Sequence, residues 1–158
     1  MPININKPLW TCPKCKQKFT TKNLWHSCTQ FTADEFFAGK DPEIKKLYKK
    51  FVKFVKQCGP VYININKTRI SIQGKMRFCG VSRVLKDGLL IAFLLNRKFE
   101  NKRIIKYEYL PPGYHIHRMK IKNEKDLDKQ LLGWIKESYK MGMREHLKSK
   151  SPPSRKQG

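Results

Sequence analysis

The sequence is poor in carboxylates and lacks any long apolar run. Only 12 of its 158 residues are Asp or Glu, against 35 that are Lys or Arg, so the formal net charge is +23. The longest apolar stretch, 89–95, has the length of a strand, whereas a helix that spans a bilayer needs ~20 apolar residues. The first ten residues contain no apolar signal region. We therefore expect a cytoplasmic protein with no part in a membrane.

The cysteines are odd in number and unevenly distributed. Three of the five cysteines, Cys12, Cys15 and Cys28, lie close together in the chain with His26. An odd number of cysteines, clustered with a histidine, favours a metal site in a reducing compartment over a disulfide framework.

The clustered residues have the spacing of a zinc site. Cys12 and Cys15 form a C-x-x-C turn, and His26 and Cys28 form a return pair. Three thiolates and one imidazole complete the tetrahedron that zinc prefers and leave no open position, so the predicted Zn²⁺ is structural. Two alternatives stay open: His26 is a bystander and the fourth ligand comes from elsewhere, or the cysteines bind no metal.

Hydrophobic periodicity predicts the elements that follow. A helical turn is expected at 33–37, and an amphipathic stripe between Asp41-Pro42 and Gly59-Pro60 predicts a helix over 41–58. A second helix is expected after Asn123, with Asn123 as its cap and its end near Gly142. Alternating patterns predict strands at 61–66, from 70 to 74, 76–84, 89–95, more weakly at 104–109, and at 114–121. The nearly all-apolar stretch 89–95 predicts a central strand that is covered on both faces.

These elements predict an α+β fold. A small N-terminal zinc knuckle would precede a mostly antiparallel sheet of four to five strands, packed with two main helices. The expected organisation is a zinc-knuckle-like module at 1–30, an α+β domain at 31–144, and a disordered basic tail at 145–158.

The order of the short motifs resembles a bacterial protein family. The N-terminal W-x-C-P-x-C and W-H-S-C are followed by F-x-G-K-x-P, G-P-V, K-T-x-I-x-I-Q and a closing L-L-G-W-I-K-E-S-Y. This series is similar to the domain-of-unknown-function family numbered 5655, and the likeness extends from about Trp10 to Tyr139. The resemblance implies a zinc-binding front and an α+β body, and it implies no particular activity.

The excess of positive charge favours a polyanionic partner. The leading hypothesis is a protein that binds DNA or RNA through the phosphate backbone. The candidate contacts are Lys14, Lys16, Lys45, Lys49, Lys53, Lys67, Arg77, Arg97 and Arg103. The plainer alternative is a soluble protein whose surface is coated with lysine, since 27 of the 35 basic residues are lysines.

Catalytic residues are harder to find. His115 and His117 fall on one face of the strand predicted at 114–121, so with nearby arginines they are candidates for a site that acts on a nucleotide or nucleic acid. The plainer interpretation is a polar sheet face. A third hypothesis is a protein-interaction or regulatory module in which zinc only stabilises the N-terminal segment. Because the carboxylates fall mostly at helix starts, turns and exposed helix faces, we expect binding rather than catalysis.

Overall fold

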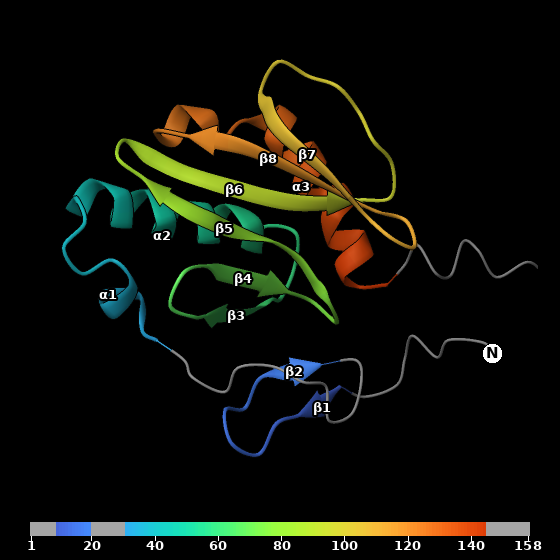
Figure 1. Ribbon diagram of the computed structural model, residues 1–158, viewed down its shortest axis with the longest axis horizontal. Coiled ribbons are helices and arrows are strands. Elements are labelled where there is room, and N and C mark those ends of the chain that lie inside the picture. The colour runs from blue at the N-terminus through green and yellow to red at the C-terminus, as the bar shows by residue number, and fades with distance from the viewer. Residues whose placement is uncertain (1–8, 20–30, 145–158) are drawn as a thin grey trace, which may run out of the picture.

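The computed structural model describes residues 9–19 and 31–144 of the chain. Figure 1 shows its elements, which follow one another as β1 (Trp10–Thr11), β2 (Lys18–Phe19), α1 (Ala33–Phe36), α2 (Pro42–Lys56), β3 (Tyr62–Ile65), β4 (Ile70–Gln73), β5 (Arg77–Leu85), β6 (Gly88–Leu95), β7 (Ile104–Leu110), β8 (Tyr114–Ile121), the 3-10 helix η1 (Glu124–Asp126) and α3 (Lys129–Gly142). These helices and strands confirm the α+β class. None of the described helices is long and apolar enough to cross a membrane.

The sheet is larger than predicted. Strands β3 to β8 form one six-stranded antiparallel sheet in the order β3-β4-β5-β6-β8-β7. The prediction of four to five strands was wrong because β7, which the sequence predicts only weakly, pairs with β8 from Ile104 to Leu110. Lys106 and Glu108 interrupt the apolar residues of this edge strand, which weakens its sequence signal.

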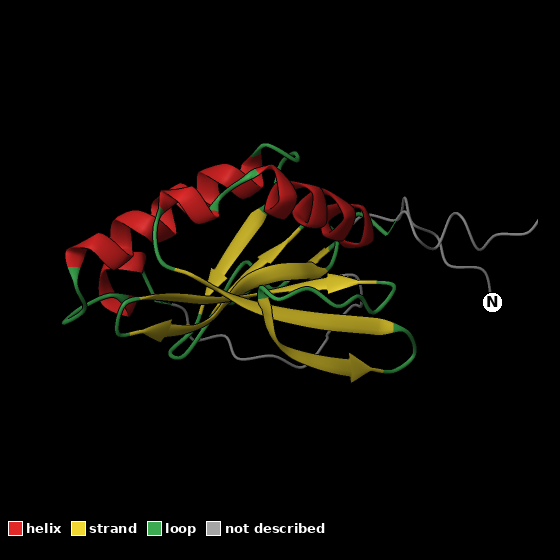
Figure 2. Ribbon diagram, turned by 90° about the horizontal axis from the view of Figure 1, so that it is seen from above, coloured by secondary structure: helices red, strands yellow, loops and turns green. Residues whose placement is uncertain are grey.

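The two long helices cover one face of the sheet and leave the other face open (Figure 2). On the covered face, Leu89, Ile91 and Leu95 of β6 have no exposed surface. On the other face, Ala92 and Leu94 of the same strand are only half-buried. The expectation that 89–95 is covered on both faces was therefore wrong. β6 is central, as predicted, but no helix packs on its outer side.

Helix α2 begins where the sequence predicts. The Asp41 side chain accepts a hydrogen bond from the Glu43 N–H at 2.9 Å, and Pro42 occupies the first turn. These are the features of a stable helix N-terminus. The helix then buries the predicted apolar stripe against the sheet, comprising Ile44, Leu47, Tyr48, Phe51, Phe54 and Val55.

Helix α3 starts later than predicted. Asn123 caps the short helix η1, and its side chain accepts from the Lys125 N–H at 2.9 Å. The cap of α3 is Asp128, whose carboxylate accepts from the Leu131 N–H at 3.0 Å. The prediction that Asn123 caps the long helix was therefore wrong, while its end at Gly142 is confirmed.

A buried serine fixes α3 to the sheet. The Ser138 hydroxyl donates to the Phe78 carbonyl at 2.8 Å and accepts from the Leu94 N–H at 3.1 Å. One side chain thus satisfies backbone groups of two adjacent strands, β5 and β6, next to their last paired residues. Buried backbone groups require such partners.

Strands β1 and β2 form a separate two-stranded ribbon. It contacts the open side of the sheet near β3 and β4 (Figure 1). The Gln73 side chain donates to the Lys18 carbonyl at 2.7 Å, and the Lys18 ammonium lies 5.5 Å from the centre of the Tyr62 ring. Residues 20–30, 1–8 and 145–158 lie outside the described part, so the predicted boundaries of the N-terminal module and the tail remain predictions.

Candidate anion-binding site on the open face of the sheet

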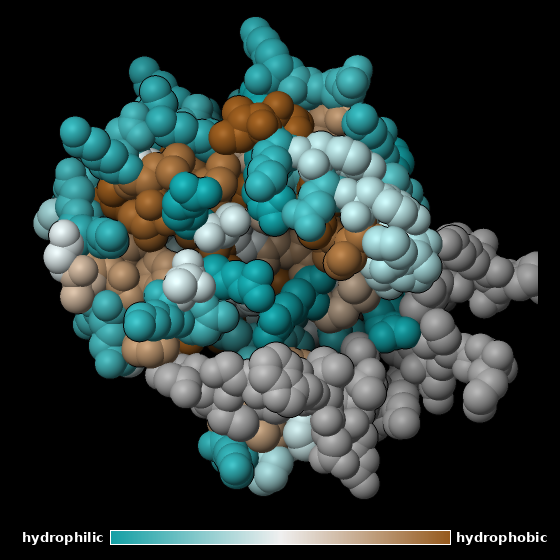
Figure 3. All heavy atoms as spheres, in the orientation of Figure 1, coloured by the Kyte–Doolittle hydropathy of each residue, from teal (hydrophilic) through white to brown (hydrophobic). Residues whose placement is uncertain are grey.

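The open face contains a hollow of about 190 Å³. This face is turned toward the viewer in Figure 3, where hydrophilic and hydrophobic side chains alternate across it. The floor of the hollow is formed by residues on the side of four neighbouring strands that faces away from the helices, namely Ser71, Gly80, Ala92, Leu94 and Ile116. Three of them, Ser71, Gly80 and Ala92, are small and pair side by side, which explains why the surface is recessed there.

Gly80 is required at this position by the neighbouring strand. A Cβ at Gly80 would lie 2.1 Å from the backbone oxygen of Ile70, which is far inside van der Waals contact. The strands β4 and β5 therefore approach more closely than a side chain allows. As a result, no side chain rises from the sheet between Ser71 and Ala92.

Two arginines flank this hollow at the two ends of β4. Arg69 precedes the strand, and Arg77 pairs with Gln73 at its far end. Desolvation lowers the pKa of Arg77 from its ordinary value, and the charge of Arg69 lowers it further. The Arg77 guanidinium nevertheless stays charged at neutral pH, because arginine is effectively always protonated in proteins. The fields of the two arginines therefore overlap in the hollow.

These two charges have no carboxylate partner in the described structure. None of the ion pairs among residues 9–19 and 31–144 includes Arg69 or Arg77. A third arginine of the hollow, Arg118, differs because it is bonded to Glu108 at 3.1 Å. Two uncompensated guanidinium groups beside a solvent-open hollow form a site suited to an anion, with the fork geometry that fits phosphate.

Some of the predicted phosphate contacts lie near this site and others do not. Lys67 is exposed in the β3–β4 turn, next to Arg69. Lys14 and Lys16 lie in the turn of the ribbon, where the Lys16 ammonium donates to the Pro13 carbonyl at 3.1 Å. Three predicted contacts are instead on α2, in the layer behind the sheet. These are Lys49 and Lys53, which are exposed, and Lys45, which pairs with Asp34.

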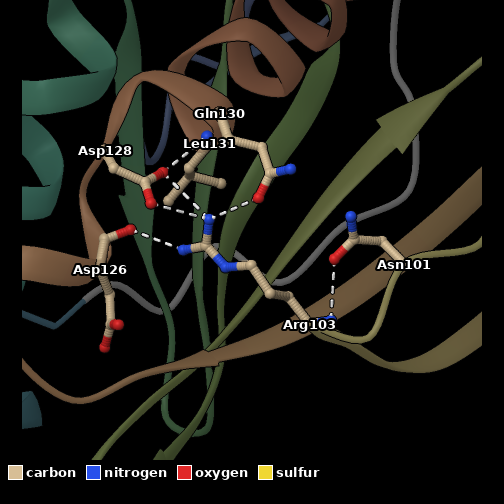
Figure 4. A network of polar contacts seen from close by, with 6 residues as sticks. All are labelled: Asn101, Arg103, Asp126, Asp128, Gln130 and Leu131. Carbon is tan, nitrogen blue, oxygen red and sulfur yellow. Dashed lines mark hydrogen bonds and ion pairs between the residues drawn. The ribbon is translucent and has the colours of Figure 1, made fainter.

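The remaining two predicted contacts are neutralised within the fold. Arg97 forms two hydrogen bonds with the Glu137 carboxylate, at 2.9 and 3.0 Å. Arg103 donates to both carboxylate oxygens of Asp128 at 3.0 Å, to Gln130 at 3.0 Å and to the Asp126 carbonyl at 2.8 Å (Figure 4). These bonds tie the β6–β7 loop to the start of α3, so the Arg103 guanidinium is committed to a structural network.

His115 and His117 share the helix-covered face of β8, opposite Leu95 and Phe93 of β6. His117 has no exposed surface and stacks on Phe93 and Phe99, with ring centres 5.8 and 4.6 Å away. Desolvation lowers the pKa of His117, and its Nδ1 has no hydrogen-bond partner among the described residues. This is the environment of a packed, neutral imidazole.

His115 is less buried than His117. Its Nδ1 is 2.7 Å from the Tyr107 hydroxyl, and its ring contacts Tyr109. The two histidines therefore lie in an aromatic cluster on the helix side and do not meet the arginines of the hollow.

The described half of the predicted zinc site has the properties of a ligand pair. Cys12 and Cys15 are in one tight turn, which is closed by a hydrogen bond from the Cys12 N–H to the Gln17 carbonyl at 2.9 Å. The Gln17 amide donates to the Cys15 sulfur at 3.2 Å, which favours the thiolate that a metal binds. His26 and Cys28 lie outside the described residues, and the described ones alone contain no group of three candidate ligands.

Arg69 is not among the nine phosphate contacts named above, although its position in a strand turn makes it a candidate for an anion pocket with Arg77 if the two converge. Ile70 and Ile72 face the core, so alternation places Arg69 and Ser71 on the other face of the same strand. Their convergence with Arg77 depends on the pairing of β4 with β5, which the sequence pattern does not specify.

Comparison with known proteins identifies a family for this chain. No curated protein and no solved structure matches the chain. The family described as a domain of unknown function (DUF5655) matches residues 33–142. That range contains the whole six-stranded sheet, the two long helices and every residue that lines the hollow. The chain therefore belongs to the DUF5655 family, whose domain forms the α+β body described above.

Proposed function

We propose that the protein binds nucleic acid, with the open face of the sheet in contact with the phosphate backbone. The observation that carries the proposal is the pair of uncompensated arginines, Arg69 and Arg77, on either side of the hollow. A net charge of +23 supports it, because such a field concentrates polyanions at the surface and accelerates their encounter.

The shape of the face favours a single strand over a duplex. A mostly apolar floor between two cations suits a chain in which an unpaired base lies between phosphates. The exposed ring of Tyr62, on the same face of the sheet, adds a surface on which a base can stack. In a duplex the base faces are hidden by stacking, so only the phosphates would be available.

The proposal includes a structural zinc ion held by Cys12, Cys15, His26 and Cys28. When bound, the metal would cross-link the ribbon to the segment that follows it. The ribbon is part of the open face, because the Arg77 guanidinium lies 5.9 Å from the centre of the Phe19 ring of β2. A fixed ribbon would therefore help to hold Arg77 beside the hollow.

A titration of a labelled single-stranded oligonucleotide against the protein at several salt concentrations tests this function. The double variant Arg69→Ala/Arg77→Ala is compared with Lys49→Ala/Lys53→Ala, which removes two exposed charges from the helix side. Each lost phosphate contact should lower the slope of log K against log salt by about 0.7. We expect a slope lower by about 1.4 for the arginine pair and no change for the lysine pair.

Two results would contradict the proposal. Absence of binding at low salt would remove nucleic acid as the partner. Equal losses for the two double variants would show that the attraction is a diffuse effect of net charge and that the hollow is not the site.

A further inference from the structure

The outer edge of β7 concentrates exposed apolar side chains. Among the described residues, three of the four large hydrophobic side chains classed as exposed belong to this strand: Ile105 (62% exposed), Tyr109 (50%) and Leu110 (48%). Soluble proteins usually protect sheet edges from such exposure. An apolar edge strand is therefore a candidate for pairing with another strand.

The backbone of this edge is available. β7 pairs with β8 on one side and is the last strand of the sheet. The additional backbone bonds of β7 within the described structure are at its ends, where the Ile104 N–H donates to Asn101 at 2.9 Å and Leu110 accepts from Gly113 at 3.3 Å. The outward-pointing groups between them are free to extend the sheet.

The side chains of β7 are complementary to a second copy of the same strand. In an antiparallel pair with a two-fold axis at Tyr107, residues whose numbers sum to 214 lie opposite each other. Lys106 then faces Glu108 of the second copy. The exposed Ile105, which lies at the irregularity of β7 between Ile104 and Lys106, comes beside the exposed Tyr109. Both kinds of contact occur twice, and cross-strand charge pairs and aromatic–β-branched pairs of this type stabilise sheets.

The charges on β7 and β8 within one molecule also favour the contact between Lys106 and Glu108 of a second copy. Lys106 lies directly opposite Arg118 in the register of β7 and β8, which places two positive charges side by side. Glu108 compensates Arg118 at 3.1 Å, whereas Lys106 has no ion pair in the described part of the chain. Glu108 of a second copy would provide the missing negative charge.

We propose that the protein forms a two-fold dimer by antiparallel pairing of β7 with β7. The two sheets become one continuous sheet, and both open faces lie on the same side of it. This inference is independent of nucleic-acid binding, because it rests on the edge of the sheet and not on the hollow.

Sedimentation equilibrium of the full chain over a range of concentrations tests the dimer. The variants Lys106→Glu and Glu108→Lys each place like charges opposite each other in a homodimer, so each should weaken self-association at least tenfold. In a mixed dimer of the two variants every facing pair is again opposite in charge. We therefore expect an equimolar mixture to recover the association of the wild type.

Lys86→Glu is the matched control, because Lys86 is exposed in the β5–β6 turn and β7 takes no part in that hairpin. It should associate like the wild type. Ile105→Thr keeps the charges and shortens the exposed apolar side chain, so it should also weaken the dimer, and far-UV circular dichroism verifies that each variant is folded. A wild type that is monomeric at all concentrations, or a mixture that fails to associate, would overturn the proposal.

Discussion

At the scale of single residues, His117 is a titratable side chain that has no exposed surface. It is fully buried among aromatic rings, and one ring nitrogen has no partner among the described residues. Its Nε2 accepts a long hydrogen bond from the Phe99 N–H at 3.4 Å. The imidazole thus behaves chiefly as an aromatic packing element that connects β8 to the β6–β7 loop.

The lowered pKa of His117 predicts a loss of stability in mild acid. Its main cause is desolvation. A backbone hydrogen bond with His115 and the charge of Glu137 raise the pKa, whereas the charges of His115 and Arg97 lower it further. In the unfolded chain His117 takes up a proton near its ordinary pKa of about 6.5, whereas the folded chain resists protonation until a lower pH. The unfolded state therefore binds more protons, and the free energy of unfolding should fall as the pH drops below about 6.5.

The variant His117→Phe isolates this effect, because phenylalanine fits an aromatic stack and cannot take up a proton. Urea unfolding between about pH 7.5 and 5.5, above the ordinary carboxylate range, should show a smaller loss of stability for the variant than for the wild type. At neutral pH the variant loses the bond from Phe99, at a cost of about 1 kcal/mol. Parallel losses in the two proteins over this pH range would contradict the prediction.

At the scale of elements, two glycines of α3 have opposite roles. A Cβ at Gly142 would lie 2.4 Å from the Phe78 ring, and the Gly142 carbonyl accepts from the N–H groups of Lys75 and Met76 at 2.7 and 2.9 Å. A Cβ at Gly133 would have nothing within 4 Å. The first glycine permits close packing of the helix end on β5, and the second is an ordinary exposed position.

Alanine at these two positions should change stability in opposite directions. Gly133→Ala should raise the free energy of unfolding by up to about 1 kcal/mol, because alanine has the higher helix propensity. Gly142→Ala gains the same propensity but must displace the Phe78 ring, so it should lower stability by about 1–3 kcal/mol. Chemical denaturation of both variants measures this, and a shift in the same direction for both would refute the packing role of Gly142.

The elements that the sequence predicts well are those whose signals are local. Helix α2 has its cap, its first-turn proline and its apolar stripe within consecutive residues, and β8 has a clean alternation. The start of α3 is different, since Asn123 and Asp128 are both good caps. Asp128 is selected by a tertiary contact, the paired hydrogen bonds from Arg103 on a distant loop.

The hollow could not be predicted from the sequence, and the reason is physical. Its lining comes from five strands, so it exists only once the strand order and registers are set. Of the nine basic residues predicted as phosphate contacts, only Arg77 lines it. Charge alone could not distinguish Arg77 from Arg97 and Arg103, which are neutralised by carboxylates far away in the chain.

At the scale of the whole molecule, the body and the N-terminal ribbon are expected to respond differently to loss of metal. Cys15→Ser should reduce the zinc content from about one equivalent to near zero and expose the N-terminal segment to protease. The body should keep its unfolding transition within about 1 kcal/mol, because its core cluster contains none of the described residues before Ala33. Metal analysis and limited proteolysis measure the two effects.

Cys58→Ser is the matched control for this measurement. Cys58 is a half-buried free thiol packed against the core, and burial raises its pKa, so it is unsuited to metal binding. That variant should retain its zinc. Equal zinc content in Cys15→Ser and Cys58→Ser would exclude the C-x-x-C turn as a ligand.

The placement of β8 between β6 and β7 has a consequence during synthesis on the ribosome. The ribosome makes β6, the most apolar strand, and then the loop and β7. Only after these does it make β8, the second of the two strands that pair with β6. One edge of β6 therefore stays unpaired until Ile121, the last residue of β8, has left the exit tunnel. β7 also stays unpaired until then, because it too pairs with β8. The nascent protein thus keeps one edge of an apolar strand open until most of the domain has been translated, and β8 then pairs with both β6 and β7.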